Sequence, residues 1–294
     1  MSLTYLEAIV IGGLQGVTEL FPVSSLGHSV LIPALIGGRW AHDLDVSAPE
    51  SPYLAFIVGL HVATAAALLV FFWRDWLRII GGFVTSIRYR RVQTPAQRLA
   101  WLIIIATIPV GIAGLLLEHV FRTTLGRPIP AAAFLLANGV VLFTGERLRR
   151  RAQRTEDTSA EDDPDTRLAR LTVPRGTVIG TAQILALLPG ISRSGVAMVA
   201  GLLRGLSHED AARFSFLLAT PVILAAGVLK VPDLFGPLGA GIHGQVLVGS
   251  LASFVSAYLA VRYLTRYFRT RTLTPFAIYC AVVGAGSLVW LSVA

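Results

Sequence analysis

The stretch QGVTELFPVSSLGHSVL, residues 15–31, decides the fold because it places polar and ionisable groups inside an otherwise apolar run. Glu19 lies one helical turn after Gln15, so a helix would put both side chains on one face. Pro22 has no N–H to donate and is expected to end that helix. A carboxylate at membrane depth normally faces a cavity or a partner. The stretch therefore predicts two short helices joined by a break inside the membrane.

The residues after the break are suited to binding an anion. Ser24 and Ser25 stand at the N-cap position of the returning helix, and Gly27 is expected to permit a tight reversal. A helix that begins inside the membrane presents free N–H groups and its positive dipole end, which favours phosphate. Taken singly, the serines are caps and His28 is a hydrogen-bonded core histidine. Together with Glu19 they predict a chemical site.

The rest of the chain has the composition of an integral membrane protein. Of 294 residues, 54% are hydrophobic and 14% charged, against roughly 25% charged in soluble domains. A spanning helix needs about 20 apolar residues. The single cysteine, Cys280, excludes an intramolecular disulfide and a cysteine-based metal site, and the N-terminus lacks the pattern of a removable signal peptide. The six segments expected to span are 52–73, 99–118, 130–147, 213–231, 245–264 and 275–294.

The net charge of +8 does not point to nucleic acid, because the arginines fall in short loops between apolar segments. Loops 74–98, 147–175, 204–213 and 262–271 hold six, eight, two and four basic residues, so the positive-inside rule makes them cytoplasmic. The N-terminal interrupted segment then enters and leaves from the outside. The other interrupted segment must enter and leave from the cytoplasm.

That other interrupted segment, LLPGISRSGVAM (187–198), repeats the pattern of the N-terminal one. Pro189 and Gly190 are expected to break the helix, and two serines to cap the next one. Arg193 offers a planar fork of donors suited to phosphate oxygens, or an ion pair with Glu19 across the cavity, and the two roles are compatible. The residues expected to bind phosphate are Arg193, Ser24, Ser192, Ser194 and Gly190.

The two interrupted segments also resemble each other, which suggests an inverted repeat with broken helices meeting near the membrane midplane. The predicted fold is an all-α integral membrane protein with six transmembrane helices and two re-entrant helical hairpins, separated by a cavity. The predicted organisation is a single membrane domain (1–294) made of a first repeat 1–146 with its hairpin 1–36, a flexible cytoplasmic linker 147–172, and a second repeat 173–294 with its hairpin 174–206.

Over essentially its whole length the chain resembles the undecaprenyl-diphosphatases, the bacitracin-resistance type of lipid diphosphate phosphatase in bacterial cell-wall synthesis. In two positions it departs from the family pattern: Gln15 replaces a common Glu, and Ala197 replaces a common Thr. The type-2 phosphatidic-acid phosphatases fit less well, because they need a lysine upstream of an Arg-Pro pair and the only lysine is Lys230. The motifs that carry the resemblance are QGVTELFPVSSLGH (15–28), PGISRS (189–194), FFWRDW (71–76), RFSFLLATP (213–221) and TPFAIY (274–279).

The resemblance implies hydrolysis of undecaprenyl diphosphate to undecaprenyl phosphate and inorganic phosphate in the bacterial plasma membrane, at a site facing the outer side. Ser25 is the expected nucleophile, with His28 or Glu19 as its base, and direct attack by water with His28 as the base stays open. Glu19 with Gln15 would hold a divalent cation, Mg²⁺ or Ca²⁺, together with phosphate oxygens.

The expected partners are the polyprenyl diphosphate lipid and the membrane, with a homodimer as an option and no nucleic acid. A flippase or transporter of the polyprenyl phosphate carrier is the alternative function, suggested by the inverted repeat and the cavity. Phosphate release from purified protein separates the two, because a pure transporter would release none.

Overall fold

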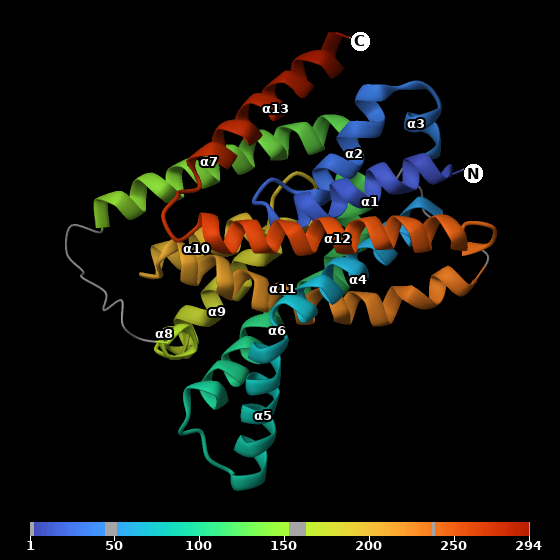
Figure 1. Ribbon diagram of the computed structural model, residues 1–294. Coiled ribbons are helices and arrows are strands. Elements are labelled where there is room, and N and C mark those ends of the chain that lie inside the picture. The colour runs from blue at the N-terminus through green and yellow to red at the C-terminus, as the bar shows by residue number, and fades with distance from the viewer. Residues whose placement is uncertain (1–2, 45–51, 153–162, 237–238, 294) are drawn as a thin grey trace.

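A computed structural model describes residues 3–44, 52–152, 163–236 and 239–293. These residues form helices and connecting turns and contain no strand, which confirms the predicted all-α class (Figure 1). The helices are α1 (Tyr5–Leu20), α2 (Ser25–Ile36), α3 (Gly38–Asp43), α4 (Pro52–Phe71), α5 (Trp73–Tyr89), α6 (Pro95–Leu125), α7 (Pro128–Ala152), α8 (Pro164–Ala169), α9 (Val173–Ala182), η2 (Gln183–Leu187), α10 (Arg193–Leu203), α11 (His208–Lys230), η3 (Val231–Phe235), α12 (His243–Tyr267) and α13 (Thr274–Val293).

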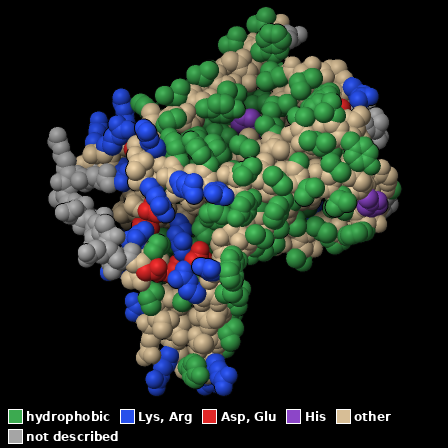
Figure 2. All heavy atoms as spheres, viewed as in Figure 1, with side chains coloured by type: hydrophobic (Ala, Val, Ile, Leu, Met, Phe, Trp, Pro, Cys, Tyr) green, Lys and Arg blue, Asp and Glu red, His purple; other side chains and the backbone are tan. Residues whose placement is uncertain are grey.

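Five of these helices are long and apolar enough to cross a bilayer. They are α6, α7, α11, α12 and α13; α6, α7 and α12 include the predicted spans 99–118, 130–147 and 245–264, and α11 and α13 overlap 213–231 and 275–294. Helices α4 and α5 pass the same test as a pair, although they are bent by 85° at the residue between them. Counting that bent pair as one span gives the predicted six. Hydrophobic side chains cover much of the surface between the ends of the molecule (Figure 2), as expected for a multi-pass membrane protein.

The segment 74–98 is not the loop that its arginines suggested. Helix α5 takes up most of it, and α6 begins at Pro95. Buried Ile79, Gly82 and Ser86 face α6, where a Cβ on Gly82 would lie 2.7 Å from the backbone of Ala96. A window of mean hydropathy averages the apolar and basic sides of such a helix, so the prediction counted its charge and missed its periodicity.

The predicted linker 147–172 is also more structured than expected. Helix α7 continues to Ala152, and α8 is fixed by ion pairs; the part 153–162 lies outside the described residues. Asp165 of α8 binds Arg213 of α11 at 2.5 Å and Arg78 of α5 at 3.1 Å, and Arg167 binds Asp210 of α11 at 2.8 Å. These partially buried pairs join three helices at the arginine-rich end, so this part of the segment is not a flexible tether.

Both interrupted segments form the predicted helix–break–helix hairpins. Helices α1 and α2 are separated by four residues, among which Ser24 adopts a φ of +72° and accepts a hydrogen bond from the Gly27 N–H at 3.2 Å. The second hairpin runs through α9 and η2, reverses around Gly190 with a φ of +115°, and continues as α10. The reversal in the first hairpin therefore falls on Ser24, whereas Gly27 is inside α2 and serves close packing.

Small residues let α1 approach α12 closely. A Cβ on Gly12 would lie 2.2 Å from the carbonyl oxygen of Gly249, and one on Gly16 would lie 2.2 Å from that of Ser253. Small residues spaced one turn apart allow backbone contact between helices in lipid, where the hydrophobic effect contributes little. This crossing fixes the helix that carries Gln15 and Glu19.

Candidate active site

Glu19, at the end of α1, collects polar groups from both hairpins. Its Oε1 accepts a hydrogen bond from Arg193 Nη2 of α10 at 2.5 Å. Its Oε2 accepts from the hydroxyl of Ser25 on α2 and from the amide of Gln15 at 3.1 Å. The side chain of Glu19 is 6% exposed and that of Arg193 is 14% exposed. The polar tips of the two hairpins therefore meet, as the sequence predicted.

Arg193 is held in place by a second helix. Its Nη1 donates to the carbonyl oxygen of Ala219 on α11 at 3.1 Å, while Nη2 faces Glu19. A guanidinium fixed on two sides loses little conformational freedom when it binds a ligand. Because Nη2 is paired with Glu19, a phosphate oxygen would have to compete with that carboxylate for the guanidinium.

His28 lies in the same region but does not contact Ser25 in the way that a base would. Its Nδ1 lies 2.7 Å from the carbonyl oxygen of Ser24, and its Nε2 lies 2.8 Å from the hydroxyl of Tyr279 on α13. A carbonyl oxygen only accepts, so Nδ1 carries a proton, and the other nitrogen is occupied by the tyrosine. The contact that would activate Ser25 is made by Glu19 instead.

The remaining serines hold the hairpins together. Ser192 caps α10 by accepting from the Gly195 N–H at 3.2 Å. The hydroxyl of Ser194 donates to the carbonyl oxygen of Phe21 at 3.2 Å, across the gap between the hairpins. The Ser194 proton is thus already donated to Phe21, whereas Ser24 only accepts in its cap and keeps its hydroxyl proton for a phosphate oxygen. Their role in binding stays a prediction.

Gly190 has a packing role at the same junction. A Cβ there would lie 2.4 Å from the carbonyl oxygen of Ala131 on α7, and a Cβ on Gly27 would lie 2.9 Å from the Cα of Gly190. Two glycines thus let the breaks of the two hairpins touch each other and α7. Side chains at either position would push the tips apart.

Sequence reasoning missed Asn138, which joins the two breaks. This buried residue of α7 donates to the carbonyl oxygen of Pro22 at 3.0 Å and accepts from the backbone N–H of Ser192 at 3.0 Å. It satisfies one free backbone group of each hairpin, which must be paired inside a membrane. An asparagine in an apolar span was the available signal.

His61 of α4 was missed as well. Its Nε2 lies 3.2 Å from Glu19 Oε2, and its Nδ1 lies 2.9 Å from the carbonyl oxygen of Ile57. With 26% of its side chain exposed, His61 is more accessible than Glu19 or Arg193. The signal was again an ionisable residue within an apolar segment.

The donor set around Glu19 fits a hard cation only in part. Gln15 Oε1 is buried and has no hydrogen-bond partner, which leaves one carboxylate and one amide oxygen as protein ligands. Over the described ranges, no group of three or more His, Cys, Asp or Glu side chains could hold a metal. Mg²⁺ and Ca²⁺ take oxygen ligands, and Mg²⁺ is commonly bound by one or two carboxylates plus phosphates and water. The residues thus fit an ion that shares most of its ligands with a phosphorylated substrate.

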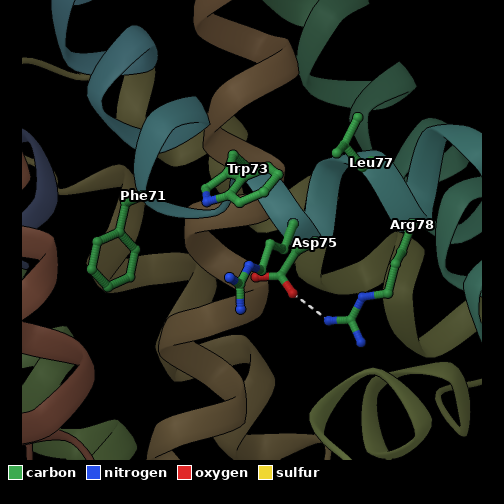
Figure 3. Close-up of a pocket in the computed structure, with 6 residues that line it drawn as sticks. Phe71, Trp73, Asp75, Leu77 and Arg78 are labelled. Carbon is green, nitrogen blue, oxygen red and sulfur yellow. Dashed lines mark hydrogen bonds and ion pairs between the residues drawn. The ribbon is translucent and has the colours of Figure 1, made fainter.

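A cavity of about 620 Å³ opens away from this site, at the bend between α4 and α5 (Figure 3). Its lining includes none of the residues that surround Glu19, so it differs from the cavity predicted between the hairpins. The residues that line it are Phe71, Trp73, Arg74, Asp75, Leu77 and Arg78.

The sequence of the chain matches a known protein family. A family model described as "Bacitracin resistance protein BacA" matches residues 8–286, a range that starts within α1 and ends within α13 and includes the breaks of both hairpins. The chain belongs to this family.

Relatives within the bacitracin resistance family match the chain from end to end. The protein from Mycolicibacterium paratuberculosis named undecaprenyl-diphosphatase is 73% identical, with 99% of this chain and 98% of that protein covered. Undecaprenyl-diphosphatase 2 of Frankia alni is 57% identical, with 96% of each chain covered. The undecaprenyl-diphosphatase of Granulibacter bethesdensis is 43% identical, with coverages of 99% and 98%.

Proposed function

We propose that the protein hydrolyses undecaprenyl diphosphate to undecaprenyl phosphate and inorganic phosphate. The observation that carries the proposal is the meeting at Glu19 of a serine hydroxyl from one hairpin and a guanidinium from the other. A relative that is 73% identical in sequence is named undecaprenyl-diphosphatase. Phosphoryl transfer needs mainly positioning and charge stabilisation, and these groups supply both.

The reaction would begin at Ser25. Its hydroxyl donates to Glu19, so the proton passes to that carboxylate as Oγ attacks the terminal phosphorus. The bond from that phosphorus to the bridging oxygen breaks, and undecaprenyl phosphate leaves with the electron pair. Water then attacks the phosphoserine and releases inorganic phosphate, while Ser25 regains a proton. In the alternative route, water attacks the terminal phosphorus directly.

Arg193 would stabilise the negative charge of the phosphoryl group being transferred. Its pairing with Glu19 keeps the two tips together until phosphate oxygens take over the guanidinium. Glu19 and Gln15 are the residues that would hold a divalent cation, which when bound neutralises negative charge on the phosphate oxygens. Ala197 is buried and contributes no hydroxyl.

Phosphate release from purified protein tests the function. Detergent-solubilised protein is expected to release inorganic phosphate from undecaprenyl diphosphate with Mg²⁺ or Ca²⁺ present, and to lose that release when a chelator is added. A transporter of the carrier lipid would release no phosphate under either condition. If release continued unchanged with the chelator, the protein would be a phosphatase that needs no divalent cation.

The broken helices and the arginine distribution support a site that faces the outer side of the bacterial plasma membrane. Lys and Arg side chains cluster around one end of the molecule and at the tip of the α5 protrusion (Figure 2), and basic residues favour the cytoplasm. Single cysteines introduced at Arg39 and Arg90 test this orientation in intact cells. A membrane-impermeant maleimide should label the first and spare the second; the reverse pattern would invert the topology.

Replacing His61 with alanine is expected to lower the rate of phosphate release by about tenfold to a hundredfold, as loss of an orienting partner commonly does. The reason is that Glu19 would lose the group that faces its Oε2 at 3.2 Å. His61→Gln keeps a side-chain N–H donor and should recover most of the rate. The assay measures kcat and KM for both variants together with their melting temperatures.

A purely structural role for His61 would give a different result. In that case both variants would lower the melting temperature, and the rate per folded molecule would be unchanged. Equal losses of kcat in His61→Ala and His61→Gln, without loss of stability, would show that the hydrogen bond to Glu19 is not what matters.

A further inference from the structure

Helix α5 presents a row of large apolar side chains that no described part of the chain covers. They are spaced alternately four and three residues apart, so they lie on one side of the helix, opposite the side packed on α6. Each is more than half exposed. The row, called here the α5 apolar stripe, consists of Trp73 (52% exposed), Leu77 (63%), Ile80 (54%), Val84 (55%) and Ile87 (54%).

Basic residues flank the α5 apolar stripe. The segment 73–91 contains five arginines and a single acid, Asp75. Asp75 is already paired with Arg78 and lies 3.1 Å from Arg213. Arg74 is exposed, packs over the Trp73 ring at 5.2 Å, and makes no ion pair with a carboxylate within the described residues. One guanidinium at the start of α5 is thus available to an anion from outside.

The cavity at the α4–α5 bend combines both features. Trp73 and Leu77 of the stripe line it together with Arg74 and Arg78, and Figure 3 shows Arg78 turned toward Asp75. A ligand with a phosphate beside hydrocarbon chains matches this lining: the arginines face its charge, and the stripe continues along its chains.

The direction of α5 agrees with a location in the headgroup region. It turns by 85° from α4, and Figure 2 shows hydrophobic side chains along one edge of the protruding segment and basic ones at its tip. Helices with an apolar row and arginines at its flanks lie in the membrane interface and are attracted to anionic lipids. Tryptophan prefers the same depth.

We propose that α5 lies in the headgroup region at the arginine-rich side of the membrane, and that the α4–α5 cavity binds the phosphate group of an anionic phospholipid through Arg74. Its acyl chains lie along the α5 apolar stripe. This site is separate from the one around Glu19, and it does not depend on the reaction proposed there.

Lipid binding to the purified full-length protein tests the proposal. Native mass spectrometry is used to measure binding of phosphatidylglycerol and phosphatidylcholine with identical acyl chains. We expect phosphatidylglycerol to bind about tenfold more tightly, because its net negative charge favours the cavity lined by arginines. Arg74→Gln should weaken phosphatidylglycerol binding more than phosphatidylcholine binding, because only the former is net anionic, and so should remove that preference. Arg262→Gln, the same charge change at an exposed position of α12, should preserve it.

Three results would overturn the proposal. The first is equal binding of the two lipids to the unaltered protein. The second is displacement of phosphatidylglycerol by millimolar inorganic phosphate, which would assign the cavity to a free anion. The third is a dimer that becomes a monomer in the Ile80→Asn variant, which would assign the stripe to a second copy of the chain. Melting temperatures of all variants identify any that fail to fold.

Discussion

Replacing Arg193 with alanine is expected to lower phosphate release from undecaprenyl diphosphate by about a hundredfold or more, the range seen when one charge-stabilising donor is removed from a transition state. Arg193 reaches Glu19 from the opposite hairpin at 2.5 Å, so it lies where the phosphoryl group must meet Ser25. The measurement is the initial rate of phosphate release at saturating substrate. Arg193→Lys, which keeps the charge but loses the planar fork, should recover only part of the rate.

The same substitution is expected to destabilise the protein. Removing the guanidinium leaves the buried carboxylate of Glu19 without its ion pair, which costs about 3–5 kcal/mol in comparable buried pairs. The double variant Glu19→Gln/Arg193→Ala removes both charges. Its melting temperature should return toward that of the unaltered protein, while its activity should stay lost. This combination separates a catalytic loss from an unfolded protein.

A matched control is an arginine in a surface pair. Arg269, in the turn after α12, lies 3.3 Å from Glu209, and its side chain is 66% exposed. Such pairs contribute little to stability, so Arg269→Ala should leave both the rate and the melting temperature nearly unchanged. If Arg193→Ala matched this control, Arg193 would have no part in the reaction.

The hairpins could be predicted from the sequence because their signals are local. A proline, a capping serine and an ionisable residue within a few positions are sufficient to indicate a break in an apolar helix, as around Pro22 and Pro189. Their meeting followed from the positive-inside rule, which places them on opposite sides of the membrane, and from their resemblance to each other, which suggests an inverted repeat. Glu19 and Arg193 pair where the two hairpins meet.

The residues that surround the hairpins could not be assigned in the same way. His61, Asn138 and Tyr279 come from α4, α7 and α13, and each is a polar residue within an apolar segment. Such a residue indicates that some partner exists, but the packing of helices distant in sequence decides which one. His28, one of the two bases expected for Ser25, is therefore hydrogen-bonded to Tyr279, and His61 lies beside Glu19, the other expected base.

The error over α5 has a different physical origin. Its arginines satisfied the positive-inside rule, but that rule does not distinguish a basic loop from a basic helix. The apolar row from Leu77 to Ile87 has helical spacing, so the signal for an amphipathic helix was present in the sequence. A test of periodicity, in addition to mean hydropathy, would have found it.

Replacing Ser25 with alanine is expected to reduce phosphate release as severely as the loss of Arg193, by about a hundredfold or more, because covalent catalysis fails without its nucleophile. The hydroxyl donates to Glu19 and is buried, so the group that would accept its proton is already in contact. The rate is measured as before, with Ser29→Ala as the control. Ser29 is a buried serine one turn further along α2, and its loss should change the rate little.

A second measurement distinguishes the two routes to hydrolysis. If Ser25 attacks, an acid quench early in the reaction should trap phosphate on the protein, and mass spectrometry of the peptides should locate it at residue 25. If water attacks directly, no phosphoprotein accumulates and Ser25→Ala retains most of its activity. Because Glu19 is the carboxylate that receives the Ser25 hydroxyl, while both nitrogens of His28 are occupied, we expect the trapped phosphoserine.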